Sequence, residues 1–312
     1  MRARRGHPLF SLFCTVAPAW GCAGTVSGAP GTGDAETPTT HAVVLVERTL
    51  DPTEGSRAEA SARFVRVAGS STTGALQTIG ASLDLPPPGS CASVSSLVAG
   101  VVLSDGAERA LIELADVGSV SIDTGDAPGA RLAPRQLPDV TDVVSGVVYA
   151  RAADPSLFPA GVPYLVHVSG GPDLDPIDTS ATAPADPIDV HVVGEDGRGG
   201  AELASGGPIE LDWPVGGLSS SDTLYVDVRP SGGSGVRCVL APDGDVAGDA
   251  GDSQAAEQRH AALPAASLFD EHGAFTEGTL VIHRVHRESF RARGLDSGEV
   301  RFDFARSLAY KR

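Results

Sequence analysis

The stretch GEVRFDFARSL, residues 298–308, decides the fold class of this 312-residue chain. In an extended strand, side chains two residues apart point to the same face of a sheet. Val300, Phe302 and Phe304 therefore share one face, which we expect to be buried. The preceding stretch TLVIHRVHRESF, residues 279–290, has β-branched residues around its charged ones. The two stretches together predict the last two strands of the protein.

Short strand signals, separated by turn residues, recur along the chain after residue 40. Four of them alternate apolar and polar residues, and the faces that we expect to be buried are Val120 and Ile122; Tyr164, Val166 and Val168; Ile209, Leu211 and Trp213; and Leu224, Val226 and Val228. Further strands are predicted in HAVVLVER (41–48), ARFVRVA (62–68), SGVVYA (145–150) and GVRCVLA (235–241), and one short helix in LPAASLF (263–269). Many short strands with little helix predict an all-β fold of antiparallel β-sandwiches.

Composition divides the chain into four parts. Residues 1–21 have the pattern of a signal peptide, and residues 22–40 are rich in Gly, Ala, Thr and Pro without an apolar period, which is typical of a flexible tether. A stretch rich in Pro and Asp, residues 171–187, separates two strand-rich halves. We therefore predict one β-sandwich domain at residues 41–186 and a second one at residues 187–312.

The N-terminal pattern is that of an exported protein. Three arginines precede an uncharged and largely apolar stretch at residues 8–20, which is well short of the ~20 residues that a transmembrane helix needs. A basic segment, a short apolar segment and a small residue before a cleavage site are typical of a secretory signal peptide.

The sequence AWGC, residues 19–22, resembles the lipobox of bacterial lipoproteins, in which a cysteine is lipidated and becomes the first residue of the mature chain. Gly21 fits the position before the cleavage site, whereas Ala19 stands where leucine is more usual. The resemblance implies that lipidated Cys22 anchors the protein to a membrane. Because Ala23 is not aspartate, it also implies the outer membrane, on either face. Ordinary signal cleavage, without a lipid, is the alternative.

Two stretches resemble strands of immunoglobulin-like and fibronectin type III domains. PIELDW resembles the second strand of that fold, which ends in a core tryptophan, here Trp213. LFPAGVPYLVHVSGG, residues 157–171, resembles the sixth strand, where a turn with Pro and Gly leads into a tyrosine, here Tyr164. With the lipobox and tether, the arrangement resembles uncharacterised lipoproteins of Gram-negative bacteria with high-GC genomes, and this resemblance implies no particular activity.

The chain is acidic, with 40 Asp and Glu against 23 Lys and Arg. Such a charge repels phosphate backbones, so we expect no nucleic-acid partner. A basic cluster lies near the end of the chain at Arg284, Arg287, Arg291 and Arg293, with Arg301, Arg306, Lys311 and Arg312 beyond it. It is either a charged sheet face that balances the acidic remainder or a contact surface for an acidic partner.

Cys91 and Cys238 are the only cysteines after Cys22. An exported protein meets an oxidising environment, so the two thiols suggest a disulfide between the two halves. The alternative is two separate cysteines, because the pairing requires a geometry that spacing alone does not establish.

Two groups of residues have side chains of the kind that bind metal ions. His283 and His286 are three residues apart, so on a strand they point to opposite faces and do not share an ion. A polar stretch between two predicted strands carries weak calcium candidates at Asp243, Asp245, Asp249 and Asp252. Their spacing departs from the EF-hand pattern, which favours a flexible acidic loop. We therefore predict no metal and no cofactor.

The sequence contains no GxSxG, HExxH, P-loop or GxGxxG motif. We therefore predict a lipid-anchored, non-catalytic protein of the cell envelope, whose two β-sandwich domains bind an envelope protein or polysaccharide or have a structural role. The alternative is an exported carbohydrate-binding or hydrolytic accessory protein. Sugar-binding faces need exposed aromatic rings, and we expect Trp213 and Tyr164 to lie in the core.

Overall fold

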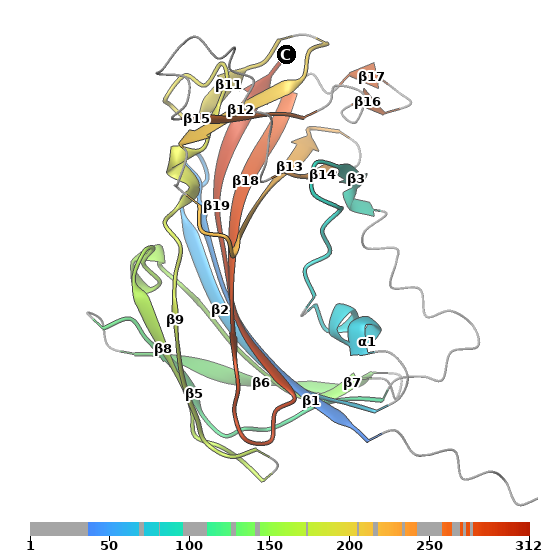
Figure 1. Ribbon diagram of the computed structural model, residues 1–312, viewed down its shortest axis with the longest axis vertical. Helices are drawn as coiled ribbons and strands as arrows, with labels where there is room; N and C mark the ends of the chain where they lie inside the picture. Colours follow the sequence, from blue (N-terminus) through green and yellow to red (C-terminus); the bar gives the residue numbers. More distant parts are fainter. Residues whose placement is uncertain are drawn as a thin grey trace, which may run out of the picture. The chain divides into compact units, whose positions relative to one another are not determined.

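The computed structural model describes residues 37–312, with gaps at 69–71, 81, 96–110, 126–128, 141–143, 173, 205, 215–217, 233–234, 242–257, 264–268, 271–272 and 275–276. Residues Glu36–Arg312 form one compact unit. It is built almost wholly of β-strands, as predicted, and most neighbouring strands are antiparallel (Figure 1).

The elements follow one another along the chain as β1 (Thr39–Leu50), β2 (Arg57–Ala68), α1 (Thr72–Thr78), β3 (Cys91–Ser93), β4 (Leu111–Leu114), β5 (Val120–Asp123), β6 (Ala130–Val140), β7 (Val144–Ala153), η1 (Pro155–Leu157), β8 (Pro163–Val168), β9 (Ile177–Thr182), η2 (Pro187–Asp189), β10 (His191–Val192), β11 (Gly200–Glu202), β12 (Ile209–Pro214), β13 (Asp222–Pro230), β14 (Val236–Val239), β15 (Gln258–Leu263), β16 (Phe269–Asp270), β17 (Gly273–Ala274), β18 (Glu277–Phe290) and β19 (Ser297–Lys311). The η elements are single turns of 3₁₀-helix.

One large sheet organises the unit. Its strand order is β3-β14-β13-β18-β19-β1-β2-β4-β7-β6-β5-β8-β9, and β11 pairs with β19 beside this path. The first strand of the fold pairs with the last in parallel, from His41 opposite Ser297 to Leu50 opposite Arg306. The long strands β18 and β19 run through the middle of the sheet (Figure 1).

The first hydrophobic core lies between β1, β2 and β19 on one side and β5, β6, β8 and β9 on the other. The predicted face of β19 supplies Val300, Phe302 and Phe304, and all three are fully buried. Tyr164 of β8 packs edge-on against Phe302, with their ring centroids 5.0 Å apart. The large sheet therefore folds over itself to enclose this core.

The second core lies between the large sheet and the small sheet β10-β12-β15. Strand β12 contributes Ile209, Leu211 and Trp213, and the facing side of the large sheet contributes strands β13, β14, β18 and β19. Leu308 of β19 belongs to this second core. A single strand thus serves both cores, with its first half in one and its second half in the other.

Strands β18 and β19 form a long hairpin that contributes to both cores, and it carries two buried arginines, Arg284 on β18 and Arg306 on β19. Arg306 binds both carboxylate oxygens of Glu195 and donates to the carbonyl of Val190. Arg284 donates to both oxygens of Asp189, at 2.9 and 3.0 Å, and to the carbonyl of Ala185. These bonds hold the crossing segment, residues 185–195, against the long strands.

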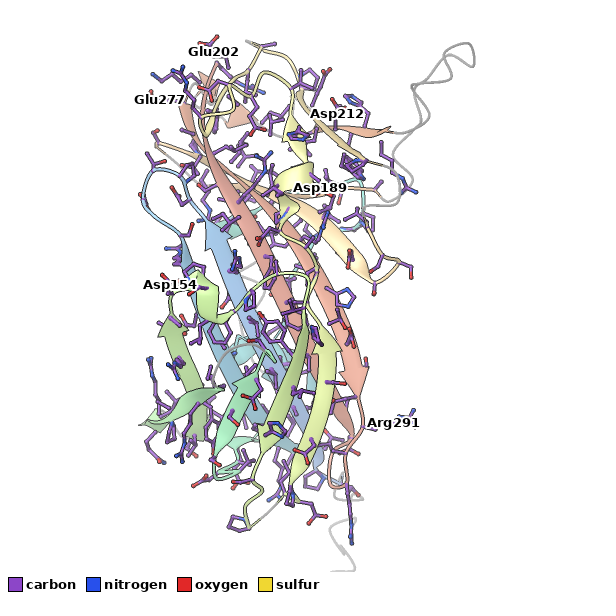
Figure 2. The ribbon with its side chains drawn as sticks, turned by 90° about the vertical axis from the view of Figure 1, so that its left-hand side faces the viewer. Asp154, Asp189, Glu202, Asp212, Glu277 and Arg291 are labelled. Atoms are coloured by element: carbon purple, nitrogen blue, oxygen red, sulfur yellow. A yellow bond between two sulfur atoms is a disulfide. The ribbon has the colours of Figure 1, made fainter. Side chains whose placement is uncertain are left out.

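Figure 2 shows where this crossing segment lies. Asp189 lies beside the long strands, between Glu277 at the start of β18 and Arg291 just after its end. Burying a charge is favourable only when it has a close partner and further hydrogen bonds. Each arginine has a carboxylate and a backbone carbonyl as partners, whereas the Nε of each has no hydrogen-bond partner among the described residues.

The predicted boundary after residue 186 falls in this crossing segment. There the chain passes from the layer that covers the first core to the layer that covers the second. The structure does not separate the chain at that point, because β1 from the first half pairs with β19 from the second. The two cores share the long strands. The division into two independent sandwich domains therefore stays a prediction.

Most predicted burial patterns are confirmed. The alternating faces of β5, β8 and β12 are buried as expected, and Leu165, on the opposite face of β8, is 45% exposed. Strand β13 differs, because Tyr225 and Asp227 on its second face are also buried. Most of the predicted helix at 263–269 lies outside the described residues, and the helix α1 was not predicted.

Candidate functional site

A pocket opens between the two sheets that enclose the second core, and we call it the interlayer pocket. It has a volume of about 590 Å³, within the range of roughly 300–1,000 Å³ that is common for small-ligand sites. Its lining residues come from β12, β13, β14, β15 and the segments beside them: Pro88, Trp213, Pro214, Leu218, Ser219, Ser220, Asp222, Thr223, Leu224, Val239, Leu240, Ala241 and Arg259.

The walls of the pocket are mainly apolar, with a few polar groups. Trp213 is 2% exposed, and its indole Nε1 has no hydrogen-bond acceptor among the residues that the structure describes. A buried N–H without an acceptor is costly in free energy. Ser219, Asp222 and Arg259 supply hydrogen-bonding or charged groups in the same lining.

A histidine with two carboxylates adjoins the pocket through Asp222, which is a lining residue. His286 Nδ1 is 2.6 Å from Asp222 Oδ1, and His286 Nε2 is 3.2 Å from Glu288 Oε1. Glu288 Oε1 also accepts from the backbone N–H of Thr182, on strand β9. Asp222 is buried and accepts from both the hydroxyl and the N–H of Ser219.

This cluster does not have the geometry of a catalytic triad. In a triad, one imidazole nitrogen faces the nucleophile and the other faces the carboxylate. Here both nitrogens of His286 contact carboxylates, and Ser221 Oγ is 3.4 Å from the nitrogen that Asp222 already occupies. The Ser219 hydroxyl donates to Asp222 rather than to the His286 imidazole. The arrangement can orient side chains and bind a ligand, but it does not activate a serine.

His283 lies on the opposite face of β18, as expected from a spacing of three residues on a strand. Its ring stacks on Tyr225, with centroids 4.2 Å apart, and its Nδ1 is 2.8 Å from Asp303 Oδ1. The Tyr225 hydroxyl donates to the other oxygen of Asp303 at 2.8 Å. Burial, together with the nearby charge of Asp303, raises the pKa of Tyr225, so the phenol stays a donor.

Asp227, beside this cluster, is fully buried. Arg237 binds it through Nε and Nη2, at 2.7 and 2.9 Å, and Arg229 adds a third bond. Burial alone would raise the pKa of Asp227, but the hydrogen bonds and charge of Arg237 outweigh this effect and lower it. Arg237 also lies over the Tyr225 ring, 4.8 Å from its centroid.

A segment that we call the strap, residues 82–90, covers this second face of β13. Leu83 and Leu85 pack against Tyr225, Val239 and Val285. The strap connects α1 to β3, and Figure 1 shows it running from the helix toward the edge of the large sheet. It explains why both faces of β13 are buried.

Cys91, directly after the strap, forms a disulfide with Cys238. The two residues lie opposite each other in the pairing of β3 with β14. The bridge joins positions 147 residues apart in the sequence. It connects the first half of the chain to the second at the edge of the sheet.

Several predicted site residues lie outside the described residues. These are the proposed lipidation site Cys22 and the four calcium candidates Asp243, Asp245, Asp249 and Asp252. In the part of the chain that the structure describes, no group of three or more His, Cys, Asp or Glu side chains has an arrangement that could hold a metal ion. The same part contains no helix that is long and apolar enough to span a membrane.

The basic cluster predicted near the C-terminus is not one surface. Arg284 is buried against Asp189, whereas Arg291 is exposed at the end of the long hairpin. Arg293, which is exposed too, pairs with Asp175 at 3.4 Å. The structure therefore divides these arginines between the junction of the two cores and the solvent.

The interlayer pocket and the histidine–carboxylate pairs were not predicted from the sequence. Of the described histidines, all except His41 lie within 3.9 Å of a carboxylate oxygen. The partners of His286 illustrate the reason, since Asp222 is 64 residues away in the chain. No local motif signals a pair that only the sheet register brings together.

No protein-family model matches the chain, and no curated protein matches it. Two of the solved structures that match are the mu homology domain of zebrafish (Danio rerio) Fcho1 with a bound Eps15 peptide, and the FN1–FN3 domains of chicken CNTN1. The first is 8% identical with a TM-score of 0.23, covering 89% of this chain and 98% of that chain. The second is 11% identical with a TM-score of 0.18, covering 81% and 78%. At these scores neither establishes a shared fold, and the comparisons assign the chain to no family.

Proposed function

We propose that this chain is a lipid-anchored, non-catalytic protein of the cell envelope that presents an immunoglobulin-like β-sandwich unit for binding. The observation that carries the binding role is the interlayer pocket, with its apolar walls and the unpaired N–H of Trp213. The adjoining histidine, held by carboxylates at both nitrogens, favours recognition over catalysis.

Two contacts support the immunoglobulin-like part of the proposal. Trp213 lies in the second core, where the resemblance of PIELDW to the second strand of that fold places a tryptophan. The Tyr164 hydroxyl donates to the carbonyl of Pro159, five residues upstream, at 2.8 Å. A tyrosine bonded to the backbone a few residues earlier is a feature of such sandwiches.

The anchoring part of the proposal depends on the N-terminal sequence. The pattern around AWGC at residues 19–22 resembles a lipobox, and the first strand begins at Thr39. The stretch between Cys22 and this strand is then the tether. One acyl chain gives only reversible membrane binding, so permanent anchoring requires more than one chain on the cysteine.

The burial of aromatic residues argues against the carbohydrate-binding alternative. Every tyrosine of the chain and the one tryptophan after Cys22 are at most 2% exposed: Tyr149, Tyr164, Tyr225, Tyr310 and Trp213. None of them forms an exposed platform for a sugar ring. A pocket ligand with an apolar body and a hydrogen-bond acceptor fits the lining better.

Lipid labelling tests the anchor. Cells are grown with a clickable palmitate analogue, and the label on the wild-type chain is compared with that on Cys22→Ala and, as a matched control, Cys14→Ala. We expect Cys22→Ala to abolish the label and Cys14→Ala to retain it. Label that persists in Cys22→Ala, or is absent from the wild type, would overturn the anchor.

Cross-linking from intact cells tests the binding role. A photoreactive amino acid replaces Ser220 in the pocket lining or, as the control, exposed Ser180 on β9. We expect discrete adducts with an envelope component from position 220 alone. An identical adduct pattern from both positions, or none from position 220, contradicts the assignment of the pocket.

A further inference from the structure

We propose that the Cys91–Cys238 disulfide is a redox switch for the interlayer pocket. In the oxidised protein the bridge holds the strap against β14, so that the two segments form one wall of the pocket, and reduction lets this wall separate. This inference rests on the proposed function, because it concerns the regulation of the pocket assigned there. It comes from the position of the bridge, which joins two segments that both line the pocket.

The two bridged segments continue directly into the pocket wall. Pro88, in the strap, lies three residues before Cys91, and it lines the pocket. On the other side of the bridge, Val239, Leu240 and Ala241 follow Cys238 and line the same pocket. The disulfide therefore fastens one wall segment to the other.

Besides the bridge, short backbone pairing fastens this part of the chain to β14 in the described residues: β3 pairs with β14 over three residues, and Val94 N donates to Gly235 O. Strand β3 has three residues and lies at the end of the large sheet. Beside it, Gly89 N donates to Val239 O, and Val239 N donates to Ser90 O. Prolines occupy residues 86–88, and proline has no backbone N–H to donate. Short edge strands are among the least stable parts of a sheet, so this one depends on the covalent bond.

The remaining strap contacts lie nearer to α1. Leu83 and Leu85 pack on the second face of β13, and Asp84 accepts from Gln77 at 2.9 Å. Asp84 O accepts from Arg237 at 3.4 Å, which is a long bond. We therefore expect the strap to separate first at its Cys91 end, beside the pocket, while the rest of the sheet keeps its pairing.

The reductant is a dithiol, such as an envelope protein with a paired-cysteine site or a small dithiol. Cys91 is half-buried and Cys238 is 1% exposed, so we expect the attacking thiolate to reach the sulfur of Cys91 rather than that of Cys238. The bond between the two sulfurs breaks, a mixed disulfide forms at Cys91, and Cys238 leaves as a thiolate that takes up a proton. The second thiol of the reductant then displaces Cys91. Two electrons and two protons pass to the protein, and the dithiol becomes a disulfide.

Trp213 reports on the pocket wall directly. The experiment uses the full chain with Trp20→Phe, which leaves Trp213 as the only tryptophan, and with Cys14→Ser and Cys22→Ser, which leave one cysteine pair. Dithiothreitol is added, free thiols are counted, and quenching of Trp213 fluorescence by acrylamide is measured with the far-ultraviolet circular dichroism spectrum.

We expect reduction to release two thiols, shift Trp213 emission to longer wavelength and increase quenching several-fold, with the circular dichroism spectrum unchanged. Reoxidation reverses the change, and a Cys91→Ser/Cys238→Ser variant has the reduced behaviour without responding to the reductant. The proposal is overturned by two released thiols with unchanged quenching, by a bridge that dithiothreitol does not reduce under native conditions, or by loss of the whole β spectrum.

This test needs no ligand, so its failure leaves the adducts expected from position 220 unaffected. Conversely, a lack of adducts in oxidised protein would refute the proposed binding role even where Trp213 responds to reduction. The two proposals can therefore fail separately.

Discussion

Removing Asp189 tests how the two cores are joined. Arg284 is 2% exposed and binds both Asp189 oxygens, so Asp189→Ala leaves a buried guanidinium with only the Ala185 carbonyl as partner. Breaking a fully buried pair in this way costs about 3–5 kcal/mol. Asp189 is 31% exposed, so in the variant water partly replaces its carboxylate as the partner of Arg284. We therefore expect a loss of ~2–4 kcal/mol in the free energy of unfolding.

Arg284→Met removes the buried charge itself and keeps an unbranched side chain. The carboxylate left behind reaches water, so we expect a loss of less than ~1.5 kcal/mol. Equilibrium unfolding in urea measures both variants, with Asp175→Ala, which removes the partner of exposed Arg293, as a control near zero. The reasoning is refuted if Arg284→Met costs as much as Asp189→Ala, because the order follows from which charge is left buried.

Three further variants test the sheet and its charges. Phe302→Ala empties a fully buried site and should cost about 3–5 kcal/mol in urea unfolding, whereas exposed Leu165→Ala should change stability by ~0.5 kcal/mol or less. The stability difference between wild type and Asp227→Asn should be largest at neutral pH and shrink as pH falls below ~4, because Arg237 lowers the pKa of Asp227 in the folded state. Glu47→Gln should instead stabilise the protein slightly at pH 7 and lose that gain toward pH ~4. Partial desolvation and two neighbouring carboxylates raise the pKa of Glu47, and the effect is small because the side chain is exposed to solvent. Thermal melts across pH measure both differences in stability from the wild type. Either prediction is contradicted if the stability difference of that variant grows as the pH is lowered.

Local periodicity predicted the strands well. In PYLVHV, alternation alone distinguishes buried Tyr164 from exposed Leu165, since one face of that strand meets the core and the other meets solvent. Asp227 is buried although alternation places it on a polar face of β13. That face is covered by the strap, a segment more than 130 residues earlier, so its burial depends on a contact that no short window contains.

Long-range pairing limited the prediction of the domains and the site. The sequence around residue 186 does mark the crossing between the two covering layers, but it does not show that β1 pairs with β19. The interlayer pocket also depends on contacts between distant parts of the chain, because Trp213 and Val239 line it from strands of different sheets. Register across sheets, rather than local propensity, determines both features.

The parallel pairing of β1 with β19 has a consequence for how the chain is made. Thr40 and Asp296 are hydrogen-bonded partners 256 residues apart, so ribosomes complete the second roughly 13–50 s after the first. During that interval β1 has no native neighbour on one edge, and an open apolar edge is prone to pair with other chains. The sheet closes only after β19 has been made, so premature termination or truncation before β19 should yield aggregation-prone protein rather than a smaller folded unit.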